Sequence, residues 1–180
     1  MERVASLREF LREETRDLHD ALDKSLSPLA GGPDYSRFLT LQLSARRPVE
    51  AWFAGHSNVL QPPAQSPLIE SDLAVLGCTT PVAPSRFSPA SPEEAIGIAW
   101  VIAGSSLGNR VMLKRRLAYD GGLATSFLSD GLMFEFWATL RPRLERGAAS
   151  NESEAAVIGA RRTFLHFLDV ARQDIGRLAA

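Results

Sequence analysis

The sequence predicts an all-α protein of one domain, with six or seven helices joined by short loops. Apolar residues recur at helical spacing from end to end, whereas the period-two alternation of half-buried strands is almost absent. Proline and glycine, which end helices, separate the periodic segments. A length of 180 residues suits one domain with a sizeable core. Every predicted helix needs its neighbours to cover an apolar face, so we expect residues 1–180 to form a single domain.

In the first half of the chain, helix-breaking and helix-capping residues mark the expected starts and ends of three helices. Helical periodicity begins near residue 6 and stops before the cluster Gly31–Pro33. Asp34 can cap the second helix, in which Pro48 predicts a kink. The pair Ser66–Pro67 opens a short third helix, which Gly77 closes.

Strong start and stop signals define the helices of the second half as well. The tetrapeptide Ser91–Glu94 offers an N-cap serine, proline at the first helical position and glutamate at the third. The pair Gly121–Gly122 breaks the chain again. A further helix follows it, and the segment SNESE opens the last one. The expected helices span about residues 6–26, 35–53, 66–76, 91–117, 132–144 and 150–178.

Composition narrows the class of protein. Apolar residues make up 45% of the chain, which is normal for a soluble globular protein, and the net charge of −1 gives no basic field for nucleic acid. The lone cysteine, Cys78, excludes an intrachain disulfide framework and a cysteine-rich zinc site. The N-terminus has no apolar core of a secretory signal, and the most apolar stretch, residues 95–113, is expected to be too short and too polar to span a bilayer. We expect a soluble, cytoplasmic protein.

The first helix carries a histidine at the edge of its apolar face. A second stripe containing Arg12, Thr15 and His19 overlaps the leucine stripe that faces the core. On one continuous helix, Arg12 would lie roughly 10.5 Å from His19, a distance that suits a ligand with a metal at one end and an anion at the other. The alternative is a core-edge histidine with a satisfied hydrogen bond.

The stretch WVIAGSSLGNR, residues 100–110, places helix-weakening residues inside the long helix predicted over residues 91–117. Gly97, Gly104 and Gly108 each cost about 1 kcal/mol relative to alanine, and Ser105 and Ser106 compete for backbone hydrogen bonds. Close packing of two helices through small residues would explain them. A kinked helix whose bare backbone approaches a large flat ligand would explain them equally well.

A planar metal macrocycle with carboxylate tails would use both unusual stretches. Heme fits, with His19 as the proximal iron ligand, Arg12 paired with a propionate, and Gly104 and Gly108 leaving space on the open face.

The same stretches resemble the heme oxygenase family, especially its bacterial, biliverdin-forming branch. LREETRDLHDALD resembles the proximal-helix pattern, whose histidine ligates the iron, and this implies that role for His19. SDLAVLG is similar to a "DL..LG" segment of the family, and Trp137 in FWATL resembles a recurrent tryptophan. WVIAGSSLGNR resembles the distal pattern "YV.EGS.LGG", with Gly104, Ser105 and Gly108 at matching positions. The ordered matches cover about residues 7–140.

Several positions depart from the family pattern. Trp100 replaces a tyrosine, Ala103 a glutamate, and Asn109 the last glycine. Many members have an aspartate on the distal helix that organises water, and Ser105 is the best-matching position here. These changes bear on turnover rate and on which heme carbon is attacked.

The resemblance implies an oxidoreductase that opens heme to biliverdin and releases CO and iron. Heme would be sandwiched between a proximal and a kinked distal helix, and O2 would react at its iron. Gly104, Ser105 and Gly108 would form the catalytic side. Electrons would come from a ferredoxin or reductase, and the product would serve iron recovery or a bilin-binding photoreceptor. The implied heme-binding residues are Arg12, Thr15, His19, Gly104, Gly108 and Asn109, with His19 on the metal.

Two other interpretations stay open at this point. The departures at Ala103, Ser105 and Asn109 suit a carrier or sensor that holds heme without degrading it. The helical fold also suits an enzyme or interaction domain with a different small ligand. Of the other histidines, we expect His56 in a surface loop and His166 at the edge of the core.

Overall fold

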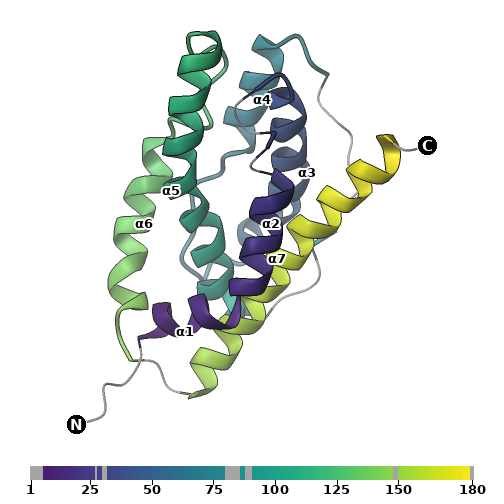
Figure 1. The fold of residues 1–180 in the computed structure, drawn as a ribbon. Helices are drawn as coiled ribbons and strands as arrows, with labels where there is room; N and C mark the ends of the chain where they lie inside the picture. Colours follow the sequence, from purple (N-terminus) through teal and green to yellow (C-terminus); the bar gives the residue numbers. More distant parts are fainter. Residues whose placement is uncertain are drawn as a thin grey trace.

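The computed structural model describes residues 6–26, 28–29, 32–79, 86–87, 91–147 and 150–178. Every regular element in these ranges is a helix, as the sequence predicts (Figure 1). The elements are α1 (Leu7–Glu14), α2 (Arg16–Leu26), α3 (Tyr35–Ala54), α4 (Ser66–Val75), the 3-10 turn η1 (Pro92–Glu94), α5 (Ala95–Asp120), α6 (Gly131–Leu144) and α7 (Ser150–Leu178).

Most of the predicted starts and stops are confirmed by backbone geometry. The Ser91–Glu94 capping box is formed, although its first turn is the 3-10 turn that precedes α5. Gly77 and Gly121 take the left-handed conformation, with φ of +67° and +76°, which glycine adopts without strain. Asp34 stands at the N-cap of α3 as expected, but its side chain makes no capping hydrogen bond.

The expectation of one continuous helix over residues 6–26 is wrong. The helix is interrupted at Thr15, whose buried hydroxyl donates to the carbonyl oxygen of Leu11 over 2.8 Å. Such back-bonding from a β-branched residue weakens the regular ladder, and α1 lies across the lower end of α2 (Figure 1). Arg12 and His19 therefore belong to different helices, and the spacing of a single helix does not apply to them.

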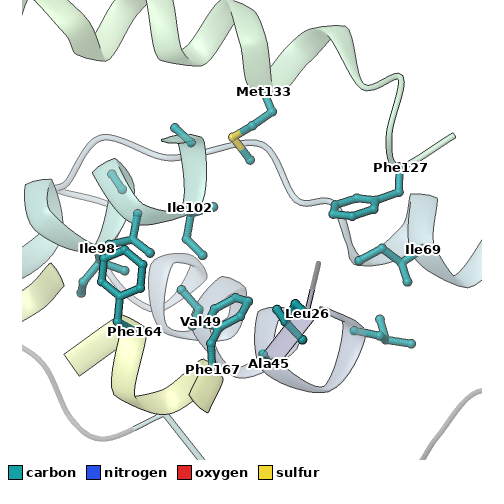
Figure 2. Close-up of a cluster of buried hydrophobic side chains, with 14 of the residues drawn as sticks. Leu26, Ala45, Val49, Ile69, Ile98, Ile102, Phe127, Met133, Phe164 and Phe167 are labelled. Atoms are coloured by element: carbon teal, nitrogen blue, oxygen red, sulfur yellow. The ribbon is translucent and has the colours of Figure 1, made fainter. Parts of the chain in front are cut away.

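The long helix α7 organises the fold. It contacts α1, α2, α3 and α5, while α4 packs against α3 and α6 packs against α5 (Figure 1). Figure 2 shows Ile98 and Ile102 of α5 beside Phe164 and Phe167 of α7, with Met133 of α6 on the other side of α5. These buried side chains join the layers into one core.

Two glycines bring the backbones of α5 and α7 into direct contact. A Cβ at Gly97 would lie 1.8 Å from the carbonyl oxygen of Ala156, and a Cβ at Gly159 would lie 2.3 Å from the carbonyl oxygen of Glu94. The guanidinium of Arg162 donates to the carboxylate of Glu94 over 2.9 Å and fastens the same junction. The packing explanation of the helix glycines therefore holds at Gly97.

Residues Pro92–Asp120 form a helical stretch that is long and apolar enough to cross a bilayer, so the expectation that it is too short is wrong. In this structure 44% of its most apolar window is buried against other helices, which is also typical of a core helix in a soluble protein.

Replacing Gly97 by alanine should destabilise the protein, because the new Cβ cannot coexist with the Ala156 carbonyl oxygen at their present separation. We expect a loss of about 1–3 kcal/mol in the free energy of unfolding, measured by urea denaturation. Gly108→Ala is the matched control, because nothing lies within 4 Å of the position that its Cβ would take and alanine favours the helix by about 1 kcal/mol. Equal effects of the two substitutions would contradict the close contact.

Candidate functional site

The three histidines differ in what their rings contact. His56 stacks on Trp52, and its Nδ1 lies 2.7 Å from the carbonyl oxygen of that residue. His166 is partly buried, and its Nε2 donates to the carbonyl oxygen of Ala45 over 2.9 Å. The ring of His19 makes no hydrogen bond to a backbone group of the described residues, and 57% of its side chain is exposed. Of the three histidines, His19 is the one whose side chain is exposed and whose ring is not held by a backbone carbonyl group.

The surroundings of His19 orient its ring. Its Nδ1 lies 3.5 Å from the carboxylate of Asp23 and 4.0 Å from that of Asp20. Phe164 of α7 packs edge-on against the ring, with centroids 5.8 Å apart. A carboxylate near one ring nitrogen favours a proton there and leaves the lone pair of the other nitrogen for a metal. This arrangement suits an axial ligand that uses Nε2.

Phe164 also joins His19 to the long helix α5. Its ring contacts Trp100 of α5 edge-on, with centroids 6.3 Å apart, so one α7 side chain lies between residues of α2 and α5. The predicted proximal and distal helices thus pack on the same part of α7. A flat ligand held by His19 would have Phe164 and Trp100 beside it.

The glycines of α5 have different environments. A Cβ at Gly104 would meet Trp137 at an ordinary 3.9 Å, and a Cβ at Gly108 would meet nothing within 4 Å. Close packing therefore explains neither of these two glycines, in contrast to Gly97. The open space at Gly108 is what an approaching flat ligand requires, whereas Asn109 is turned inward and is only 5% exposed. The kink expected in α5 is not seen as a break in its helical pattern.

A buried arginine lies next to the predicted distal position. Arg46 of α3 donates from Nη2 to the hydroxyl of Ser105 over 2.7 Å, and Ser105 in turn donates to the carbonyl oxygen of Ile102. Ser106 bonds the carbonyl oxygen of Ala103 in the same way. Sequence reasoning did not find Arg46, because the run ARRP gives no sign of which arginine is buried. The amphipathic pattern of residues 35–53 could have identified Arg46. It places Arg46 four residues after Gln42 and three before Val49, on the same face of the helix.

The residues present fit heme. An exposed imidazole with a carboxylate behind it, an aromatic side wall and an uncrowded glycine on α5 are what a metal macrocycle needs. Thr15 is buried at the junction of α1 and α2, and Arg12 is exposed on α1. Their contacts with heme stay predictions.

Comparisons with known proteins agree with this assignment. A heme oxygenase of Xanthomonas campestris pv. campestris is 37% identical to the chain over 109 residues, which are 56% of this chain and 63% of that protein. The chain thus matches less than two thirds of the length of that relative. No protein-family model matches the chain.

The heme oxygenase of Neisseria meningitidis, solved with NO and CO bound, superimposes with a TM-score of 0.74. The match covers 95% of this chain and 92% of that one at 23% identity. The chain has the heme oxygenase fold. The resemblance predicted from the sequence motifs is therefore confirmed, and the all-α architecture with it.

His166 should make the stability of this heme oxygenase fold depend on pH. Burial lowers the pKa of His166 below its ordinary value of 6.5, so the unfolded chain binds the proton more readily than the folded one. Stability should fall as the pH drops below about 6.5, by at most about 1.4 kcal/mol per pH unit for one proton. Urea unfolding of the wild type and of His166→Gln at pH 7.5 and 5.5 measures this. A loss of stability as large in the variant as in the wild type would assign the effect to other groups.

Proposed function

We propose that this protein is a heme oxygenase, which opens heme oxidatively to biliverdin and releases CO and iron, with O2 and external electrons. The observation that carries the proposal is the exposed imidazole of His19 on α2, joined to α5 through Phe164, in a chain with the heme oxygenase fold. The similarity to the Xanthomonas campestris heme oxygenase supports the same activity. Heme is both the substrate and the group that binds O2 when it is present.

His19 would bind the heme iron on the α2 side. Asp23 would accept a hydrogen bond from Nδ1, which holds the ring in one orientation and strengthens Nε2 as a donor to the metal. Phe164 would limit rotation of the ring through its edge-on contact. These side chains bind and orient the substrate and take no part in bond making.

The α5 side would provide space and a polar surface for O2. Gly108 lets the backbone approach the macrocycle, and Gly104 and Ser105 complete the side on which the ring is attacked. Because Ser105 is neutral, it would hold water as a hydrogen-bonding partner without accepting a proton at neutral pH. Apolar walls at Trp100 and Phe164 would exclude bulk water from the macrocycle.

The reaction requires an electron donor, and a ferredoxin or a reductase would supply it. Release of iron suits iron recovery, and release of biliverdin suits supply to a bilin-binding photoreceptor. We place the protein in the bacterial cytoplasm, in line with its similarity to heme oxygenases of two bacteria.

His19→Ala should abolish specific heme binding or convert it to a weak, ligand-free form. The change removes the available imidazole without disturbing the core, because the side chain is mostly exposed. Titration with hemin, followed by the heme absorbance band, should show a sharp band for the wild type and none for the variant. Added imidazole should restore the band. The matched control is His56→Ala, whose ring is held by Trp52, and it should bind heme as the wild type does.

Turnover is tested by an absorbance time course. Hemin-loaded protein is mixed in air with an electron donor, with catalase present to remove free peroxide. We expect the heme band to decay into a biliverdin spectrum with release of CO, and only when His19 is intact. A sharp band that persists under these conditions would instead identify a heme carrier or sensor. The absence of any specific band would leave only the fold in common with heme oxygenases.

A further inference from the structure

Arg46 is a fully buried cation, and no carboxylate of the described residues hydrogen-bonds to it. Its side chain is 1% exposed and lies over the rings of Phe127 and Phe167, at 5.1 and 5.8 Å from their centroids. Nε donates to the side chain of Gln42 over 3.0 Å, and Nη2 donates to Ser105 over 2.7 Å. Both acceptors are neutral, so the charge of the guanidinium is not neutralised by direct contact.

The nitrogen Nη1 of Arg46 is buried without a hydrogen-bond partner. Only two other buried side-chain atoms of the described residues share this state, Oε1 of Gln65 and Oγ of Ser66. Unpaired donors of a charged group are costly, and native proteins keep them mainly where function requires them. The guanidinium thus reaches the predicted distal position through its other terminal nitrogen, Nη2, which donates to Ser105.

Two carboxylates act on Arg46 from a distance. Burial lowers the pKa of Arg46 to about 10, while Glu50 and Asp130 act in the opposite direction, so the side chain stays charged at neutral pH. The carboxylate of Glu50 accepts from the backbone N–H groups of Gln65 and Ser66, and that of Asp130 accepts from the side chain of Gln65. Other donors hold both carboxylates, and neither carboxylate hydrogen-bonds to Arg46, so Ser105 is the acceptor of Nη2.

Ser105 connects Arg46 to the open side of α5. Residues three apart on a helix share a face, so Ser105 lies beside Gly108, where the structure has open space. The hydroxyl of Ser105, an exposed residue, accepts from Arg46 and donates to the Ile102 carbonyl oxygen at 2.7 Å. Rotation about the Cβ–Oγ bond would redirect the hydroxyl proton toward a ligand, while the oxygen still accepts from Arg46. A hydroxyl that accepts from a guanidinium is a stronger donor, because linked hydrogen bonds polarise one another.

We propose that Arg46 and Ser105 together form a charge-assisted donor for a small anion bound to the heme iron on the α5 side. This inference rests on the proposed function, since it places heme between His19 and α5. Arg46 is a positioning residue that acts through Ser105, and Ser105 makes the contact with the anion. The pair favours negatively charged iron ligands over neutral ligands of similar donor strength.

The test compares anion binding by variants of the ferric, heme-loaded protein. Azide and fluoride are the anionic probes, neutral imidazole is the reference, and each affinity is obtained by absorbance titration. Arg46→Met should weaken both anions by about tenfold or more, as expected for loss of a charge-assisted hydrogen bond. Imidazole affinity should change by less than about twofold. Methionine has a similar length and no charge, so it fills the buried site without leaving a charge unpaired.

Arg47→Met is the matched control. Arg47 is the next residue of the same helix, and its guanidinium pairs with Glu70, so the variant removes the same charge without touching Ser105. Its azide and fluoride affinities should equal those of the wild type. Ser105→Ala should reproduce the loss seen with Arg46→Met, and the double variant should lose no more than either single variant. If Arg46→Met fails to fold, Ser105→Ala decides the question, because Ser105 is an exposed residue whose hydroxyl can be removed without opening the core.

Three results would overturn the inference. Equal anion affinities of the Arg46 and Arg47 variants would show that the buried charge has no effect on the ligand. A parallel loss of azide and imidazole affinity would show a structural role alone. A wild-type protein with no specific heme band would overturn this inference and the proposed function together. A normal band combined with unchanged anion affinity would leave the proposed function intact.

Discussion

The direct backbone contact between α5 and α7 is the constraint on which the rest of the structure depends. Gly97 lies against the carbonyl group of Ala156, and Gly159 lies against the carbonyl group of Glu94. At each glycine a side chain would occupy the space that the carbonyl group takes. This contact fixes the position of α5 along the axis of α7. Trp100 follows Gly97 by less than one turn, and this brings its ring onto Phe164. Because α2 packs on the same helix, Phe164 also meets His19, and one short part of α7 positions both sides of the site.

Several residues of the candidate site are ones that lower the stability of the helix in which they lie. Gly108 could be alanine without a clash, and Ser105 and Ser106 direct their hydroxyls to backbone oxygens of their own helix. His19 stays exposed, while His166 is partly buried and its Nε2 donates to the carbonyl oxygen of Ala45. Local rules that are broken without a compensating contact are expected at functional positions. The continuous apolar core, which includes Phe164 and Phe167, offsets the stability lost at these residues (Figure 2).

Much of the fold could be predicted from the sequence because its helices end at strong local signals. The capping box at Ser91 and the left-handed glycines at Gly77 and Gly121 act within a few residues, and such signals need no knowledge of the tertiary structure. The break at Thr15 could not be predicted, because residues 7–23 have the periodicity of one helix and the sequence does not show that α1 and α2 each pack on α7. The sequence points to His19 as a ligand, and that role stays a prediction that its surroundings support.

The environments of the helix glycines and of Arg46 depend on contacts between segments that are distant in the sequence. Gly97, Gly104 and Gly108 look alike in the sequence, and only the position of α7 distinguishes a packing glycine from an open one. Arg46 and Arg47 are neighbours with the same chemistry, yet one is buried and the other pairs with Glu70. Helical phase settles which of two adjacent residues faces the core, but it cannot show that Ser105, 59 positions later, is the acceptor.

The charge behind Ser105 gives the α5 side of this protein an electrostatic character that a lone serine would not provide. An aspartate there would carry its own negative charge and could exchange protons with water. Here a neutral hydroxyl stands in front of a buried cation, and the carboxylates of Glu50 and Asp130 balance that cation only from a distance. Inside a low-dielectric core this separation of charge is felt strongly at the nearest accessible polar atom, which is the Ser105 hydroxyl. Ser105 of α5 and Arg46 of α3 are joined by a hydrogen bond, and the two side chains therefore have to be considered as one unit.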